Sequence, residues 1–342
     1  MVYPKLLEPG YKIGVTATSA GFTEETDLIR LESGMKHFSD LGYPVVVTDN
    51  VRKCEKGRSS DGPTRAFELL QLVQDPEIRA IIAASGGDYL VEMLPYIDFE
   101  LIKENPKWLQ GFSDTTGLVF TITTNLDIAT IYANNFSSFG MGEWHSSLYN
   151  NLRTLEGKDI IQQSFDYYQD GYQPRITGLE GFVPEKEVRW VNLYPTKYDQ
   201  NNELTITGRA LGGCLDVCLN LVGTRYDKVK EFAHRYQRDK ILWFFESYAL
   251  NTEALIRGLW QLKEAGWFEH AAGFVFGRPC MYDTDNDTSY KDAVLSVLGS
   301  LNLPIILDAD IGHKPPQFTM INGAIACIRS LGGRGSIIFE RR

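Results

Sequence analysis

The sequence has little cysteine and little histidine, with five of each among 342 residues. The cysteines form no CxxC pair, which argues against a zinc ribbon or a thioredoxin-type site. There is no HExxH or EF-hand pattern, and the glycine-rich stretches match neither GxGxxG nor a P-loop. We therefore expect neither a metal nor a cofactor. Cys214 and Cys218 would share one helix face, and we interpret them as packing residues in a reducing compartment.

Basic charge is also scarce. Lysine and arginine number 34 against 44 acidic residues, so the net charge is -10 and the pI about 5.1. This balance argues against nucleic acid or an anionic membrane as the main partner. No apolar run approaches the roughly 20 residues that span a bilayer. The start, MVYPKLLEPGYKIGV, lacks the basic and apolar regions of a signal peptide, so we expect a cytoplasmic protein.

Short apolar runs alternate with amphipathic segments in the first half of the chain, which predicts a parallel sheet covered on both faces. One helix is expected to be capped by Thr23 and to bury Leu28, Leu31 and Met35. Another should begin at Asp61 and Pro63 and run through Phe67, Leu70 and Val73, and a third, apolar helix should run from Thr115. The expected strands are Lys12–Thr18, Val45–Thr48, Ala80–Ala84, Trp108–Phe112 and Ile128–Tyr132.

A second alternating block follows a stretch of poor periodicity from about residue 140 to residue 202. It predicts a helix at Asn251–Ala265, another helix directly after Gly212-Gly213, and a closing antiparallel pair. The length suggests two domains. We place them at 1–165 and 203–342, with 166–202 as a connector that carries recognition loops. The expected strands are Leu204–Arg209, Ile241–Phe245, Gly273–Phe276, Pro304–Leu307, Ala324–Ile328 and Ser336–Phe339.

Two candidate features lie where predicted strands end, which is the edge at which parallel sheets bind ligands. Ser113 falls on a sharp strand-to-helix turn, where its hydroxyl would project outward and the next backbone N–H could stabilise an oxyanion. Alternatively, Ser113 only caps the helix. Gly86-Gly87 could supply a second N–H donor or could simply form a turn.

A serine nucleophile needs a base, and His313 is the only histidine in a stiff loop, bounded by Gly312, Pro315 and Pro316. Glu246 follows the five apolar residues Ile241–Phe245, where an unpaired carboxylate would be costly. Its partner could be a lysine or arginine in a salt bridge. The alternative partner is His313, which gives the chain order Ser, Glu, His.

Taken together, these segments resemble the LD-carboxypeptidase family (peptidase family S66), which includes the microcin-immunity peptidases. The resemblance extends over nearly the whole chain and rests on the order and spacing of several short motifs. These are Leu6–Ser19, Ser85-Gly86-Gly87, Pro106–Thr116, Leu242–Glu246, Gly266–Pro279, and Ile311-Gly312-His313 with Pro316.

The resemblance implies a catalytic triad of Ser113, Glu246 and His313. It implies an oxyanion hole from the backbone N–H groups of Asp114 and the Gly86-Gly87 turn. It also implies an α/β protein, with an N-terminal flavodoxin-like or amidotransferase-like parallel-sheet domain and a C-terminal swivelling β/α domain, usually as a homodimer. A class I glutamine amidotransferase would need cysteine at position 113. A non-catalytic α/β ligand-binding protein remains the alternative of another class.

The expected activity is removal of a C-terminal D-amino acid from an LD-peptide such as murein tetrapeptide, in peptidoglycan recycling. The alternative substrate is a microcin C-type peptidyl- or aminoacyl-nucleotide, whose hydrolysis would give self-immunity. Many murein enzymes of the family carry arginine where this chain has Ser85, which favours the alternative. Trp190 could stack on a nucleobase if its indole is exposed, or could pack inside the connector.

Overall fold

The computed structural model describes residues 1–158, 161–193, 203–284 and 287–341. The chain forms two compact units. Unit 1 comprises Met1–Asp159 and Gln173–Phe182, and unit 2 comprises Ile160–Tyr172 and Val183–Arg342. The chain therefore crosses between the units three times. The end of the expected connector, 194–202, lies outside the described residues.

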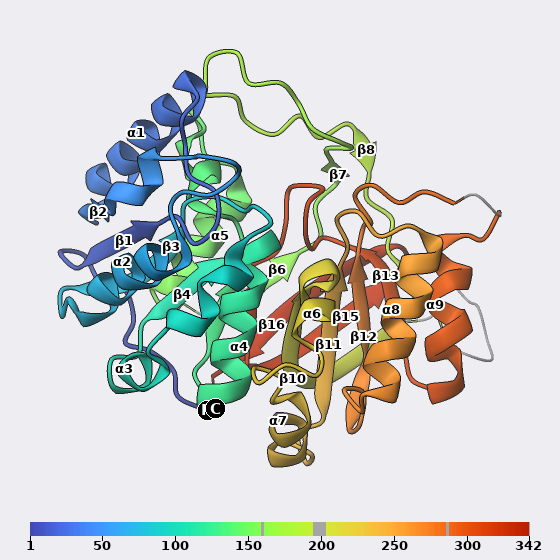
Figure 1. The fold of residues 1–342 in the computed structure, drawn as a ribbon. Helices are drawn as coiled ribbons and strands as arrows, with labels where there is room; N and C mark the ends of the chain where they lie inside the picture. Colours follow the sequence, from blue (N-terminus) through green and yellow to red (C-terminus); the bar gives the residue numbers. More distant parts are fainter. Residues whose placement is uncertain (159–160, 194–202, 285–286, 342) are drawn as a thin grey trace. The chain divides into compact units, whose positions relative to one another are not determined.

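Unit 1 is built on parallel strands, as expected. They lie in the order β5, β4, β3, β1 and β2, and each neighbouring pair is parallel. Figure 1 labels β1 to β4 of this sheet. The carboxyl ends of β3 and β4 therefore share one edge, and these ends carry Gly86 and Ser113. The strands are β1 (Lys12–Thr16), β2 (Val45–Val47), β3 (Ile78–Ala83), β4 (Trp108–Gly111) and β5 (Thr130–Tyr132).

The helices of unit 1 follow the sequence pattern with some shifts. Asp61 caps α2 by accepting a hydrogen bond from the Thr64 N–H at 2.8 Å. Thr23 does not cap α1, because Glu24 occupies the N-cap position and makes no side-chain cap bond. The α-helices are α1 (Glu25–Asp40), α2 (Gly62–Gln74), α3 (Phe99–Glu104), α4 (Thr116–Leu126) and α5 (Ser146–Leu155). The 3-10 turns are η1 (Asp49–Arg52), η2 (Leu90–Glu92), η3 (Leu94–Tyr96), η4 (Ser113–Thr115) and η5 (Phe136–Gly140).

Unit 2 contains an eight-stranded mixed sheet in the order β6, β16, β15, β10, β11, β12, β13 and β9. Strands β10 to β13 are parallel, and antiparallel strands flank them on both sides. The closing antiparallel pair is confirmed as β15 and β16. The strands are β6 (Gln162–Gln163), β9 (Val191–Leu193), β10 (Leu204–Cys214), β11 (Ile241–Glu246), β12 (Ala271–Gly277), β13 (Ile305–Ala309), β15 (Ile325–Leu331) and β16 (Arg334–Glu340). A separate pair, β7 (Tyr167–Tyr168) and β8 (Lys186–Glu187), and the short β14 (Met320–Asn322) also belong to this unit.

One expectation for unit 2 is confirmed and another needs correction. Gly212-Gly213 precedes a helix as expected, within the longer strand β10, where the Phe244 backbone occupies the space of a Cβ on Gly212. Cys214 ends that strand and caps the following helix, so it does not share a helix face with Cys218, although both are buried. The helices are α6 (Leu215–Leu221), α7 (Val229–Arg235), α8 (Thr252–Glu264), α9 (Tyr290–Leu298) and η6 (Gly299–Leu301).

The stretch expected to be an irregular connector is partly regular, because α5 and four short strands fall within 140–202. Within the described ranges, no helix is long and apolar enough to cross a membrane.

Candidate active site

Ser113 lies at the turn between β4 and α4. Its φ of +61° is a left-handed conformation that costs a non-glycine residue about 1–3 kcal/mol and is often found at functional positions. The turn is tight, since a Cβ on Gly111 would lie 2.8 Å from the Thr115 Cβ and 2.9 Å from the Asn135 Oδ1. Asn135 also accepts a hydrogen bond from the Phe112 N–H at 3.0 Å. The sharp turn expected at Ser113 is therefore present.

Gly86 lies beside Ser113. A Cβ built on Gly86 would lie 3.2 Å from both the Cβ and the Oγ of Ser113. Gly87 has a φ of +146°, and a Cβ there would lie 2.9 Å from the Ser19 Cβ and 3.0 Å from the Ala20 nitrogen. Glycine at position 86 thus lets the backbone of this turn approach the Ser113 hydroxyl, and glycine at position 87 lets it approach Ser19 and Ala20.

Asp114 links the Ser113 turn to the glycine turn through its side chain. Its buried carboxylate accepts hydrogen bonds from the Leu90 N–H at 2.9 Å and from the Ser19 hydroxyl. Ser19 in turn accepts from the Tyr89 N–H at 3.1 Å. Burial raises the pKa of Asp114 despite these donors. The sequence analysis assigned a role only to the Asp114 backbone, and it missed this carboxylate.

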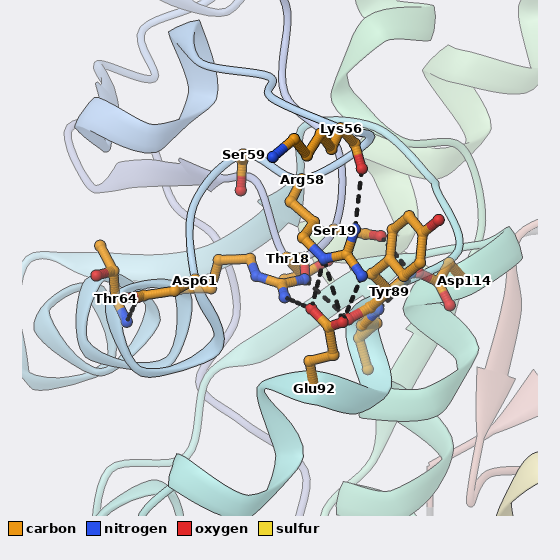
Figure 2. Close-up of polar contacts among 12 residues, drawn as sticks. Thr18, Ser19, Lys56, Arg58, Ser59, Asp61, Thr64, Tyr89, Glu92 and Asp114 are labelled. Atoms are coloured by element: carbon orange, nitrogen blue, oxygen red, sulfur yellow. Dashed lines mark hydrogen bonds and ion pairs between the residues drawn. The ribbon is translucent and has the colours of Figure 1, made fainter.

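An ion network holds the segment that follows the glycine turn (Figure 2). Glu92 is bound by Arg58 at 2.6 Å and by Arg65 at 2.9 Å. The fully buried Arg65 also donates to the carbonyls of Tyr89 at 2.9 Å and Thr18 at 3.1 Å, and the Arg58 guanidinium lies 3.5 Å from the Tyr89 ring centroid. These contacts fix the backbone at Thr18, next to Ser19, and at Tyr89, which donates its N–H to Ser19.

Unit 2 carries the other two candidate residues. Glu246 ends β11 and is fully buried, and its Oε2 lies 2.7 Å from the Nδ1 of His313. The partner that we expected for the buried carboxylate is thus confirmed as His313. Burial alone would lower the pKa of His313, but the Glu246 charge and hydrogen bond outweigh it, so the net pKa is raised.

Glycines make room for Glu246. Gly312 has a φ of +97°, and a Cβ there would lie 2.5 Å from Oε2 and 2.6 Å from Cδ of Glu246. A Cβ on Gly277 would lie 3.0 Å from the Glu246 Cβ. The Glu246 carboxylate therefore rests against bare backbone, which fixes its direction toward His313.

Asp216 and Tyr248 complete the surroundings of this pair. Asp216 accepts from the N–H groups of Tyr248 and Ala249, both at 2.9 Å, and so holds the segment that leaves β11. The Tyr248 ring lies 4.8 Å from the His313 ring, centroid to centroid. The Asp216 charge also contributes to the raised pKa of His313. Sequence reasoning missed both residues; the one available signal was an acidic residue at the start of the helix after β10.

Models of two family domains match the chain. The LD-carboxypeptidase N-terminal domain matches residues 13–133, and the LD-carboxypeptidase C-terminal domain matches residues 207–328. The chain belongs to the LD-carboxypeptidase family. The first match contains Ser113 with Gly86 and Gly87, and the second contains Glu246 and His313.

Relatives extend this similarity to nearly full length. The chain is 27% identical to the microcin C7 self-immunity protein MccF of Escherichia coli, over 93% of this chain and 91% of the relative. It is 24% identical to a probable murein peptide carboxypeptidase of Bacillus subtilis, over 96% and 91%. A solved MccF-like protein from Bacillus anthracis is similar at a TM-score of 0.83 and 25% identity, covering all of both chains.

The two expected substrate-binding residues of this LD-carboxypeptidase family member have different surroundings. Ser85 is half-buried, lies two residues after the end of β3 and precedes Gly86. Trp190 is only 3% exposed, and its indole N–H donates to the Asp310 carboxylate at 3.1 Å. Stacking on a nucleobase requires an exposed indole, and the Trp190 indole is buried. The structure therefore agrees with the alternative, in which Trp190 is a packing residue. Among the described residues, no group of three or more His, Cys, Asp or Glu side chains could hold a metal ion.

Proposed function

We propose that the protein is a serine carboxypeptidase in which Ser113, Glu246 and His313 form the catalytic triad. The observation that carries this proposal is the 2.7 Å hydrogen bond between His313 and the fully buried Glu246, in a chain whose other family domain presents Ser113 on a strained turn. A buried carboxylate that binds one ring nitrogen of histidine fixes the tautomer, which leaves the other nitrogen as a base.

The mechanism is acyl transfer. Because the Nδ1–H of His313 donates to Glu246, the lone pair of its Nε2 takes the proton from the Ser113 Oγ, which attacks the scissile carbonyl carbon. The oxyanion that forms is held by backbone N–H groups of Asp114 and the Gly86-Gly87 turn. The carbon–nitrogen bond then breaks as His313 gives its proton to the leaving amine. Water, deprotonated by His313, releases the acyl group and restores Ser113.

The first-choice substrate is a small LD-peptide with a C-terminal D-amino acid, such as murein tetrapeptide. The description of both matching domains and the Bacillus subtilis relative support this choice. The second candidate is a peptidyl- or aminoacyl-nucleotide, supported by the Escherichia coli self-immunity relative and by Ser85 in place of a cationic residue. We further propose that the enzyme works in the cytoplasm as a homodimer, as the family resemblance implies.

The test is a parallel assay of purified protein on an LD-tetrapeptide and on an aspartyl sulfamoyl-adenylate. Each substrate is tested with wild type, with Ser113→Ala and with a control serine in α9, Ser296→Ala. We expect release of the D-amino acid, a loss of several orders of magnitude in Ser113→Ala as for other serine triads, and no loss in Ser296→Ala.

Hydrolysis of the adenylate alone would replace the first substrate with the second. Full turnover by Ser113→Ala would refute the triad. A protein that binds an LD-peptide, turns over neither substrate and does not react with an active-site serine reagent would be a non-catalytic binding protein.

A further inference from the structure

His313 lies in the middle of a loop, residues 310–318, that is closed at its base. The Phe318 N–H donates to the Asp310 carbonyl at 2.7 Å, and the Gly312 N–H donates to the Gln317 side chain at 3.3 Å. The loop is therefore a small ring of backbone with His313 at its far side. Contacts that fix the positions of Asp310 and Phe318 therefore also restrict the position of His313.

Asp310 is the buried anchor of this loop, with none of its surface exposed. Its Oδ1 accepts from Arg278 at 2.6 Å, and its Oδ2 accepts from the Trp190 indole at 3.1 Å and the Phe165 N–H at 3.3 Å. Arg278 also donates to the Asp308 carbonyl at 2.8 Å, just before the loop. A buried carboxylate with three donors is held in one position, because losing a donor leaves charge unsatisfied.

Trp190 contacts both ends of the loop. Its N–H binds Asp310 at the start, and its ring meets the Phe318 ring at the end, with centroids 5.8 Å apart and planes at 63°. The opposite side of the indole is closed by β16, because a Cβ on Gly335 would lie within 2.6 Å of the Trp190 Cη2. The indole is thus fixed between β16 and the base of the loop.

We propose that Trp190 is a positioning residue for His313, which holds the loop through Asp310 and Phe318 so that the imidazole meets Glu246. The proposal rests on the proposed function, in which His313 is the base. The groups that face His313 in unit 2 are Glu246, Asp216 and the Tyr248 ring, and its neighbour Lys314 pairs with Asp170 at 2.7 Å. Trp190 itself meets the loop at Asp310 and at Phe318, so we expect a Trp190 effect on His313 to pass through the loop.

The experiment compares Trp190→Phe with a matched control, Trp267→Phe. Trp267 is also a fully buried tryptophan of unit 2, and its indole donates to the Asp227 carboxylate at 3.3 Å. Each variant keeps a ring and loses one N–H donor to a carboxylate. The measurements are kcat and KM, the melting temperature, and the pKa of His313 by NMR of histidine-labelled protein, with His313→Gln to assign the signal.

For Trp190→Phe we expect kcat to fall by roughly 10- to 100-fold with KM little changed, as for small misplacements of catalytic groups. The NMR pKa of His313 should move down toward its ordinary value, because a looser loop weakens the Glu246 bond. Trp267→Phe should show a similar change in melting temperature with the wild-type kcat and His313 pKa. Gly335→Ala, which displaces the indole without removing its N–H, should reproduce the Trp190→Phe effects.

An unchanged His313 pKa in Trp190→Phe overturns the inference, whether or not kcat falls. A rise in KM for the adenylate alone, at unchanged kcat, also overturns it and restores a substrate contact. These outcomes are separate from those of the proposed function, which is tested by turnover of the two substrates and by the activity of Ser113→Ala. The NMR measurement needs no turnover and so tests the positioning in either case.

Discussion

Gly312→Ala tests the central pair most directly, because it adds one methyl group against the Glu246 carboxylate. The new Cβ would lie 2.5 Å from the Glu246 Oε2, whereas ordinary contact begins at 3.4 Å, so the carboxylate must withdraw by about 0.9 Å. A movement of that size away from His313 opens a 2.7 Å hydrogen bond beyond the usual range. Misplacement of about 1 Å can cost roughly 100-fold in rate, and we expect a loss of that order in kcat.

The substitution also carries a backbone cost, which needs a control. Position 312 has a φ of +97°, and a left-handed alanine costs about 1–2 kcal/mol. Gly10→Ala has the matching strain, with a φ of +93°, but nothing lies within 4 Å of the added Cβ. Both variants should melt at lower temperature, and only Gly312→Ala should lose activity. If the two retain kcat values within about twofold of each other, the Glu246–His313 geometry does not govern the rate.

Two further predictions concern the triad. Since His313 must be neutral to act as a base and its pKa is raised, kcat/KM should fall with decreasing pH through a midpoint above the ordinary histidine value of about 6.5. The stability effect has the opposite sign: the raised pKa stabilises the folded chain fully below pH about 6.5, and this contribution disappears as the pH rises through the folded value. If kcat/KM instead falls with a midpoint below pH about 6.5, the assignment of His313 as the base is contradicted. The double variant Ser113→Ala/His313→Ala should be barely slower than either single variant, because triad members act as a unit; additive losses in kcat would argue against a shared role.

Much of the fold could be predicted because strand ends and helix starts are local features. Asp61 caps α2 as expected, and Leu255, Leu259 and Leu262 of α8 are all buried. The exact face of a helix is harder to predict. The helix through Phe67, Leu70 and Val73 is present as α2, yet Phe67 is 60% exposed. The helix instead buries a stripe that includes Ala66, Leu69 and Val73.

In the candidate site, too, one part could be predicted from the sequence and another part could not. The Glu246–His313 bond follows from one physical argument, the cost of an unpaired carboxylate after a buried strand, together with a resemblance that named the partner. The roles of the Asp114 carboxylate, Asp216 and Trp190 depend on contacts between residues distant in sequence. Trp190 and its acceptor Asp310 are separated by 120 positions, and no local pattern marks that pair. Sequence alone could not tell whether Trp190, an aromatic residue in a polar segment, is exposed or buried, because its partner Asp310 is distant in the chain.

The path of the chain between the units limits how this protein can be recombined. Residues 160–172 belong to unit 2 and provide its edge strand β6, which pairs with β16, but the chain then returns to unit 1 for residues 173–182. A single crossover point therefore cannot divide the protein into two native halves. A chimera joined between the two family domains, anywhere from 160 to 182, would combine segments of both parents within one unit. An exchange that keeps Ser113 with the sheet of unit 1, and Glu246 and His313 with the sheet of unit 2, needs three junctions, near 159, 172 and 182.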